Sequence, residues 1–165
     1  MDRLKGKVAI ITGGNSGVGE ATAKMFAKEG ATVVITARRE AALEKVAEEI
    51  KAAGGEVFAV STDISKKGDP ERLMNLVIEK YGKVDILVNN AGILEEGLKP
   101  IDRFSDEDLD RIVETNEKGT MRCMRAASQK MQAGASIVNV ASIAGVKGCC
   151  LLYTSPSPRD GATSR

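Results

Sequence analysis

The sequence predicts an α/β fold, in which helices cover both faces of a doubly wound parallel sheet. Short apolar runs rich in β-branched residues alternate along the chain with longer segments whose apolar residues recur at helical spacing. A glycine-rich turn separates the first apolar run from the first helical segment. Regular alternation of strand and helix is typical of parallel sheets. Right-handed crossovers then predict the strand order 3-2-1-4-5.

Residues 7–26, KVAIITGGNSGVGEATAKMF, organise the rest of the chain. Residues 8–11 predict an interior strand, because the run is β-branched and too short for a buried helix. Four glycines follow, and then a helical segment begins with Val18, Ala21 and Met25 at helical spacing. Glycine permits positive φ and lets a ligand lie against bare backbone, while unpaired amides at a helix start attract an anion. The arrangement predicts a loop that binds a phosphate or pyrophosphate.

The glycine spacing separates three kinds of phosphate loop. A nucleoside-triphosphatase loop needs Lys and then Ser or Thr after its last glycine, but Gly19 is followed by Glu20. The GxGxxG fingerprint would need a glycine at Thr22. What the chain has is TGxxxGxG, beginning at Thr12. This pattern, directly after the first strand, resembles the cofactor loop of short-chain dehydrogenase/reductases. The resemblance implies a Rossmann-like sheet and these cofactor-binding residues: Thr12, Gly13, Asn15, Ser16, Gly17, Val18 and Gly19.

Length, charge and composition exclude several classes of protein. A chain of 165 residues suits one domain, and 24 basic against 23 acidic residues give no reason to expect nucleic acid or an anionic membrane as a partner. No apolar run approaches the length of a membrane span, and the start, MDRLKGK, lacks the core of a signal peptide. We therefore expect a cytoplasmic protein. The chain has no histidine and its three cysteines form no CxxC, so no metal site is predicted.

The second strand is predicted at residues 32–36, and arginines follow at its carboxyl end. An NAD-preferring family member would carry an acidic residue near Ala37, whereas here Arg38 and Arg39 come next. The guanidinium fork suits a 2′-phosphate, so we expect NADP, with NAD less favoured and Arg38 as the contact. The alternative is a solvated arginine pair at a helix start.

The middle of the chain continues the alternation. Residues 40–53 predict an amphipathic helix, and its apolar stripe consists of Leu43, Val46, Ala47 and Ile50. A third strand is predicted at residues 57–60. The resemblance implies that Asp63 and Ile64, which follow it, contact the cofactor's adenine, although an aspartate here also suits a simple turn.

A further helix is predicted to start with Asp69 as its N-cap and to end at Gly82. The fourth strand, residues 84–88, then runs into the sequence NNAG at residues 89–92. NNAG is the second family resemblance, and it implies that Asn90, Ala91 and Gly92 close over the cofactor. The small Ala-Gly pair permits a ring to approach closely.

A long helix is predicted to begin with a capping box at residues 105–108. Its apolar stripe, Leu109, Ile112 and Val113, continues to Asn116, so that this amide should point inward and need a partner there. The resemblance implies that Asn116 holds a water that links to a catalytic lysine. The alternative is an amide bonded to its own helix backbone.

The fifth strand is predicted at residues 135–141, with Ser142 at its end. In the resembling family this serine forms a hydrogen bond with the substrate oxygen during hydride transfer, and a Tyr-x-x-x-Lys motif follows the serine in the sequence. The expected positions hold Ser155 and Arg159, the nearby Tyr153 has no lysine after it, and no lysine occurs beyond Lys147.

We therefore expect residues 1–148 to be the amino-terminal part of a dinucleotide-binding domain, truncated after its fifth strand. Residues 149–165 lack a helical or strand period and resemble translated read-through rather than a natural continuation. The resemblance implies an NADP-dependent oxidoreductase that acts on a secondary alcohol or ketone, such as a 3-oxoacyl thioester, with a homotetrameric parent. This chain would then be an inactive fragment. The alternatives are a non-catalytic dinucleotide-binding module and an unstable fragment with a bare sheet edge.

Overall fold

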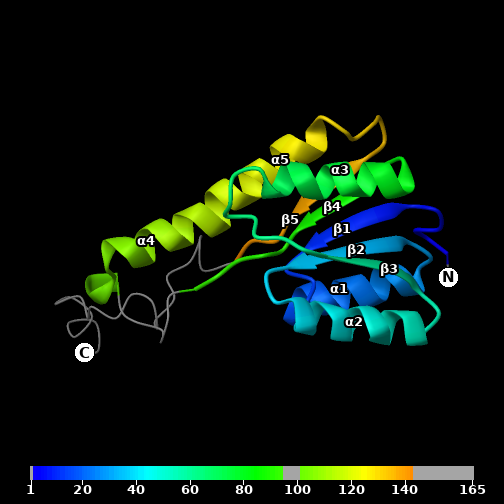
Figure 1. Cartoon of the computed structure of the whole chain (residues 1–165), viewed down its shortest axis with the longest axis horizontal. Helices are drawn as coiled ribbons and strands as arrows, with labels where there is room; N and C mark the ends of the chain where they lie inside the picture. Colours follow the sequence, from blue (N-terminus) through cyan, green and yellow to red (C-terminus); the bar gives the residue numbers. More distant parts are fainter. Residues whose placement is uncertain (1, 95–100, 143–165) are drawn as a thin grey trace, which may run out of the picture.

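A computed structural model describes residues 2–94 and 101–142 of the chain, and it contains one five-stranded sheet (Figure 1). The strand order is β3-β2-β1-β4-β5, and every neighbouring pair is parallel. Both the fold class and the order predicted from the sequence are confirmed. The strands are β1 (Val8–Thr12), β2 (Thr32–Ala37), β3 (Glu56–Ser61), β4 (Ile86–Asn89) and β5 (Ser136–Asn139).

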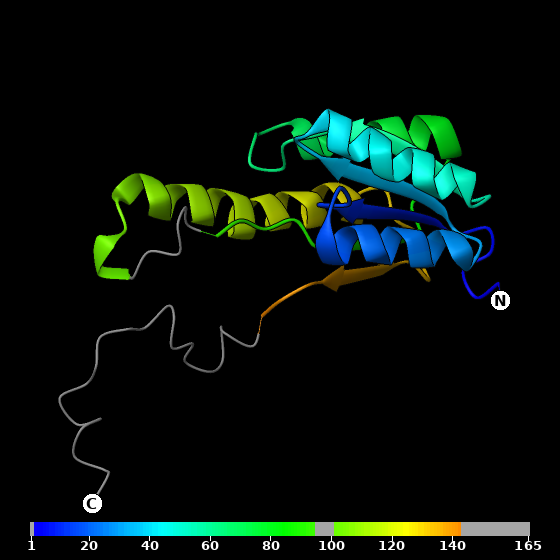
Figure 2. The same ribbon diagram turned by 90° about the horizontal axis from the view of Figure 1, so that it is seen from below.

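Helices cover both faces of this sheet. On one face lie α1 (Gly17–Lys28) and α2 (Glu40–Ala52), and on the other lie α3 (Asp69–Tyr81) and α5 (Thr120–Ser128) (Figures 1 and 2). A short 3-10 turn, η1 (Ile101–Arg103), precedes one long helical rod. The rod consists of α4 (Asp106–Ile112), the π-helical segment η2 (Val113–Gly119) and α5, and its first part extends past the carboxyl ends of the strands.

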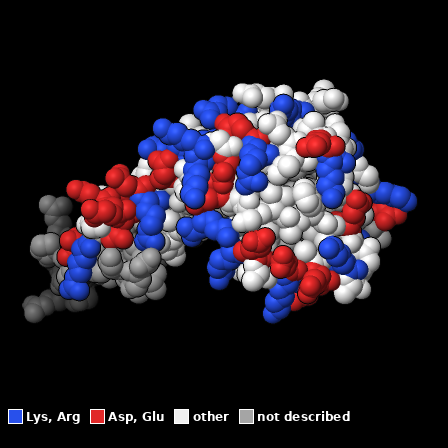
Figure 3. All heavy atoms as spheres, viewed as in Figure 1, with Lys and Arg blue, Asp and Glu red and all other residues white. Residues whose placement is uncertain are grey.

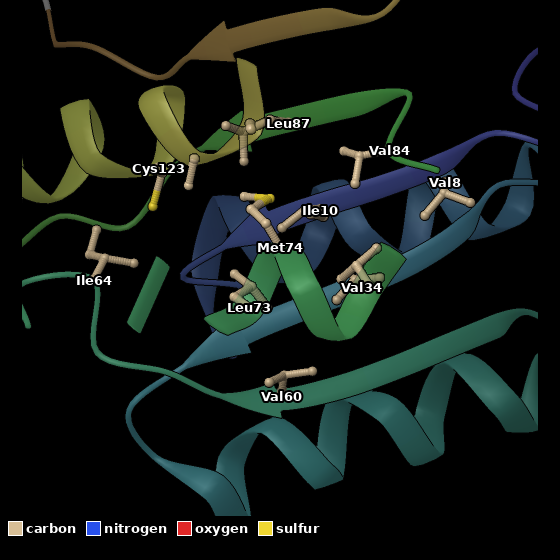
Figure 4. Close-up of a cluster of buried hydrophobic side chains, with 13 residues drawn as sticks. Val8, Ile10, Val34, Val60, Ile64, Leu73, Met74, Val84, Leu87 and Cys123 are labelled. Carbon is tan, nitrogen blue, oxygen red and sulfur yellow. The ribbon is translucent and has the colours of Figure 1, made fainter. Parts of the chain in front are cut away.

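The core forms two layers because β1, β2 and β4 are buried on both faces. Val8 and Ile10 of β1 point toward α3 and α5, where they pack with Leu73, Leu87 and Cys123 (Figure 4). Ala9 and Ile11 alternate with them and pack toward α1 and α2. All four residues of the predicted α2 stripe are buried in that second layer. Each large aliphatic side chain removed from water contributes about 1.5–3 kcal/mol before entropy is counted, so these layers dominate the folding energy.

Two predicted helix faces are wrong. Val18 and Met25 of α1 are 64% and 60% exposed, while Gly19 and Ala23 are buried instead. Small residues let the helix lie close against the sheet, so the larger apolar side chains face outward. In the long rod, Leu109 is 42% exposed, because α4 lies beyond the sheet that would cover it.

Several element ends also differ from the prediction, and β5, expected at residues 135–141, spans only Ser136–Asn139. The N-cap of α3 is Gly68, with φ of +88°, rather than Asp69, whose carboxylate instead accepts a hydrogen bond from the Asp63 amide at 3.0 Å. The fourth strand begins at Ile86 rather than at residue 84, and Asp85 directly before it accepts a side-chain hydrogen bond from the Val8 amide at the start of β1. Residues 149–165, the predicted non-native tail, lie outside the described residues.

The β5 strand lies at the edge of the sheet and is exposed along its whole length. Ile137, Val138 and Val140 are 37%, 46% and 47% exposed. Figure 2 shows β5 on the side away from β3, and none of the other described strands pairs with its outer edge. The predicted bare edge is therefore present.

Candidate functional site

A cavity of about 240 Å³ opens at the carboxyl ends of the strands, where the chain switches from β1 toward β2 on one side and β4 on the other. In open α/β sheets this switch point is where ligands bind. The lining residues come from the end of β2, the four loops after β1, β2, β3 and β4, and the π-helical segment: Gly13, Asn15, Ser16, Thr36, Ala37, Arg38, Arg39, Thr62, Asp63, Ile64, Asn90, Ala91, Gly92, Ile93 and Thr115.

The glycine loop and the NNAG segment are locked together at the base of this cavity. The side-chain Nδ2 of Asn90 donates to the backbone carbonyls of Thr12 and Gly13 at 3.0 and 3.3 Å. The Thr12 hydroxyl accepts from the backbone amides of Asn90 and Ala91, both at 3.0 Å. Thr12 is fully buried, so it supports the loop from below rather than lining the cavity.

The approach between these segments requires glycine. A Cβ on Gly13, whose φ is +68°, would lie 2.9 Å from the Ala91 Cα, and one on Gly19 would lie 2.3 Å from the Gly13 carbonyl oxygen. Gly19 therefore packs the helix start against the loop and does not line the cavity, and neither do Gly17 and Val18.

The start of α1 faces the cavity with uncapped backbone. Ser16 is the N-cap residue of this helix, and its side chain makes no capping hydrogen bond. Asn15 and Ser16 both line the cavity. First-turn amides that no side chain caps are hydrogen-bond donors for an anion, and the helix dipole favours negative charge at the same place. This end of the cavity suits a pyrophosphate.

The loops after β2 and β3 form the other end of the cavity. Arg38 and Arg39 line it together with Ala37, so basic side chains stand where the sequence placed them. Asp63 lines it too, but its Oδ1 also accepts from the Ser65 amide at 3.1 Å and the Ser65 hydroxyl at 2.7 Å. The turn interpretation of Asp63 is therefore confirmed, and its contact with an adenine stays a prediction at a residue that lines the cavity.

Asn116 lies in the π-helical segment and bonds across to the chain after β4. Its Oδ1 accepts from the Ile93 amide and its Nδ2 donates to the Ile93 carbonyl, each at 2.8 Å. The expectation of an inward-pointing amide with a partner in the fold is confirmed, and the alternative of bonding to its own helix is wrong. One donor and one acceptor of this amide remain for another partner.

Ser142 lies three residues beyond β5, is exposed and does not line the cavity. The β5 strand is tied to its neighbour at this end, since the Asn89 amide donates to the Asn139 side chain at 2.9 Å. The structure thus brings together the predicted loop, arginine, aspartate and NNAG residues, but it leaves Ser142 outside this group.

Four lining residues were missed by the sequence analysis: Thr36, Thr62, Ile93 and Thr115. Thr36, Thr62 and Ile93 lie within a few residues of a strand's carboxyl end, so the position of each strand end could have indicated them. Thr115 precedes Asn116 on the rod and carried no comparable signal.

Charges around the site are mixed. Figure 3 shows acidic and basic side chains interspersed over the face in view, and α4 begins with Asp106, Glu107 and Asp108. Hydrogen bonds from Lys118 and Arg122 lower the pKa of Glu114 in the π-helical segment.

Among the described residues, no group of three or more potential metal ligands occurs, and no helix combines the length and apolar character that a membrane crossing requires.

Comparison with known proteins identifies the chain's relatives. The family model described as short chain dehydrogenase matches residues 7–154. The chain belongs to this short-chain dehydrogenase family. A 3-oxoacyl-[acyl-carrier-protein] reductase of Thermotoga maritima is 36% identical over 148 residues, which cover 88% of this chain and 59% of the relative. An uncharacterised oxidoreductase of Listeria innocua is 39% identical over 146 residues, 87% of this chain and 58% of the relative.

Solved structures of short-chain dehydrogenases share the fold. One from Burkholderia cenocepacia in complex with NADP superposes with a TM-score of 0.83 at 33% identity, covering 89% of this chain and 60% of that one. The short-chain dehydrogenase chain described here therefore spans roughly three fifths of the length of these relatives.

Proposed function

We propose that the chain binds NADP in the cavity at the strand ends and is the cofactor-binding part of an oxidoreductase. The observation that carries this proposal is the pairing of two features in one cavity: an uncapped helix start beside the glycine loop, and Arg38 and Arg39 at the end of β2. The first suits a pyrophosphate and the second suits a 2′-phosphate. The relative from Burkholderia cenocepacia, whose structure contains NADP, supports the same assignment.

The residues present fit a dinucleotide. Gly13 and Gly19 allow the loop, the NNAG segment and the helix start to pack closely, and a Cβ on Gly92 would be in van der Waals contact with the Asn116 Oδ1, 3.5 Å away. Asn15, Ser16 and the first-turn amides would bind the phosphates, while Asp63 and Ile64 would hold the adenine. When bound, the nicotinamide supplies or accepts a hydride.

For chemistry, we assign the substrate side to Ser142 and Asn116. Ser142 would donate a hydrogen bond to the oxygen of a ketone or secondary alcohol, such as a 3-oxoacyl thioester. Asn116 positions residues 92–93 through its two bonds to Ile93, and its remaining donor and acceptor would hold a relay water. A tyrosine-lysine pair would have to supply the acid-base step, and this chain has no lysine after Lys147.

Calorimetric titration of the 165-residue chain with NADPH and with NADH tests the proposal. We expect NADPH to bind more tightly, because only NADPH carries the phosphate that the arginines would bind. Equal affinity would remove the NADP assignment, and no binding of either nucleotide would remove the cofactor site.

A second candidate is a dinucleotide-binding module without catalysis, which the missing Tyr-x-x-x-Lys motif favours. The two candidates separate when a family-like Tyr-x-x-x-Lys segment and carboxyl-terminal half are joined to residues 1–148. We expect NADPH-dependent ketone reduction from that chimaera and none from the chain as it stands. Turnover by the 165-residue chain would contradict the expectation that this chain is inactive. A chimaera that binds NADPH but stays inactive would contradict the assignment of residues 1–148 to an oxidoreductase.

A further inference from the structure

The loop after β3, residues 62–65, forms one wall of the cavity and rests on the helical rod. Ile64 of this loop lines the cavity and also belongs to the buried layer that contains Cys123 of α5 (Figure 4). Beneath it, Gly119 leaves so little space that an added Cβ would lie 3.0 Å from an Ile64 side-chain carbon. The position of this wall therefore depends on the residues of the rod that pack against it, such as Gly119 against Ile64.

Arg122 is the side chain of the rod that reaches the loop. It is only 11% exposed, and its Nη1 donates to the Ser65 carbonyl oxygen at 2.8 Å. Its Nη2 donates to Glu114, which lies in the π-helical segment directly before Thr115, another residue that lines the cavity. One guanidinium thus bonds both the loop that carries Asp63 and the segment that carries Thr115.

We propose that Arg122 is a positioning residue for the adenosine end of the cofactor site. It touches neither the cavity nor any atom that a nucleotide would contact, since it is not among the lining residues. It acts by holding Ser65, whose amide and hydroxyl in turn fix the carboxylate of Asp63. The inference rests on the proposed dinucleotide site and adds a residue outside that site on which its geometry depends.

The charge environment supports a fixed guanidinium at this position. Glu114 is the carboxylate that the rod offers to Arg122, and Lys118 shares it at 2.9 Å. Hydrogen bonds to charged groups are stronger than those between neutral groups, so the paired guanidinium is a stiff link. Without it, the loop keeps its own turn bonds but loses the contact of its Ser65 carbonyl with the rod.

The chain offers a matched control three residues away. Arg125 lies on the same helix and also pairs with a glutamate, since its Nη2 donates to Glu71 of α3 at 2.7 Å. It lies one helical turn further from the cavity. Arg122→Ala and Arg125→Ala therefore each remove one arginine-glutamate link from α5, but only Arg122→Ala removes a link to the cavity wall.

The experiment titrates the full chain and both variants with NADPH, adenosine 2′,5′-bisphosphate and nicotinamide mononucleotide, and checks thermal unfolding in parallel. If Arg122→Ala leaves the wall correctly placed a tenth of the time, affinity for NADPH and the bisphosphate falls about tenfold. Affinity for the mononucleotide should stay unchanged. Arg122→Lys, which keeps the positive charge but has a single donor nitrogen, should recover part of the loss. Arg125→Ala should bind all three like the parent.

Amide hydrogen exchange without ligand gives a readout independent of binding. We expect the Ser65 and Lys66 amides to exchange faster in Arg122→Ala than in the parent or in Arg125→Ala. Unchanged exchange and affinity in Arg122→Ala, or equal losses in the two variants, would overturn the inference. If the parent binds no nucleotide, the proposed function fails, and the exchange rates still decide whether Arg122 holds the loop.

Discussion

Under the proposed function, Arg38 is the side chain that would favour NADP over NAD. It lines the cavity beside Ala37, where a carboxylate would be needed to bind ribose hydroxyls. A hydrogen bond to a charged group is worth about 1.5–3 kcal/mol, so Arg38→Ala should weaken NADPH binding by roughly tenfold to a hundredfold. NADH affinity should not change, because NADH lacks the 2′-phosphate. Calorimetric titration with both nucleotides measures the ratio.

Arg125→Ala is the control for this substitution, because it removes an equal charge far from the cavity. A parallel loss of NADPH and NADH affinity in Arg38→Ala would mean that the arginine supports the loop rather than reading the phosphate. The same ratio in the parent and in the variant would assign the phosphate to Arg39 or to neither.

At the scale of single residues, motif and spacing predicted most of the site. Gly13 of the TGxxxGxG pattern, Asn90 of NNAG, and Asp63 after the third strand all line the cavity. The sequence did not reveal that Thr12 is buried beneath the glycine loop or that Thr115 lines the cavity. Both roles depend on how a strand end and a distant helix meet. Such long-range geometry has no local pattern.

The π-helical segment is the part of the rod that binds the chain after β4. Asn116 is its link, because its amide pairs with both backbone groups of Ile93. Asn116→Leu keeps the shape but leaves the two Ile93 groups without these partners, which should cost about 1–3 kcal/mol of unfolding free energy. Denaturant unfolding measures this loss, and hydrogen exchange at the Ile93 amide should accelerate.

Asn75→Leu provides the comparison, since Asn75 is an exposed asparagine on α3. It should change stability far less. Equal effects of the two substitutions would show that the Ile93 bonds contribute nothing beyond the general cost of an exposed leucine.

The start of the sheet is held by a different element contact. Asp85, just before β4, accepts from the Val8 amide at 2.8 Å and pairs with Lys83 at 2.9 Å and Lys7 at 3.4 Å. Burial alone would raise the pKa of Asp85, but the hydrogen bonds from Val8 and Lys83 outweigh it and lower that pKa below 3.8.

Because the folded-state pKa of Asp85 is lowered, its contribution to stability is present in full above the unfolded-state value. That contribution is lost as the pH falls through the folded-state pKa. We expect the unfolding free energy of the parent to fall below about pH 4 more steeply than that of Asp85→Asn. Urea unfolding at a series of pH values measures both curves, and parallel curves would contradict the role of this carboxylate.

At the scale of elements, alternation and apolar periodicity predicted every described strand and the order of the sheet. Helix faces were less predictable. In α2 the stripe is clear because one face meets the sheet and the other meets water. In α1 the face that packs against the sheet consists of the small residues Gly19 and Ala23. The spacing of the larger apolar residues therefore predicted the wrong face. Strand ends shifted by one or two residues, as at the start of β4.

At the scale of the whole molecule, we expect the exposed side of β5 to determine whether copies of the chain associate in solution. Edge strands with free backbone groups and apolar side chains recruit other strands and promote aggregation. Ile137, Val138 and Val140 present such a surface here, and the neighbouring strand β4 covers one edge only. About two fifths of each relative's length lies outside the match, so the relatives have further chain with which to cover a corresponding surface.

A charge on this edge should therefore keep the chain monomeric. Val138→Lys places a lysine on the edge strand, where charge opposes pairing with a second copy. Light scattering over a range of protein concentrations should show less association than in the parent. Met121→Lys is the matched comparison, because Met121 is 57% exposed on α5 and away from any strand edge. If both lysines suppress association equally, the effect comes from net charge. If neither does, the β5 edge is not the surface through which copies of this chain meet.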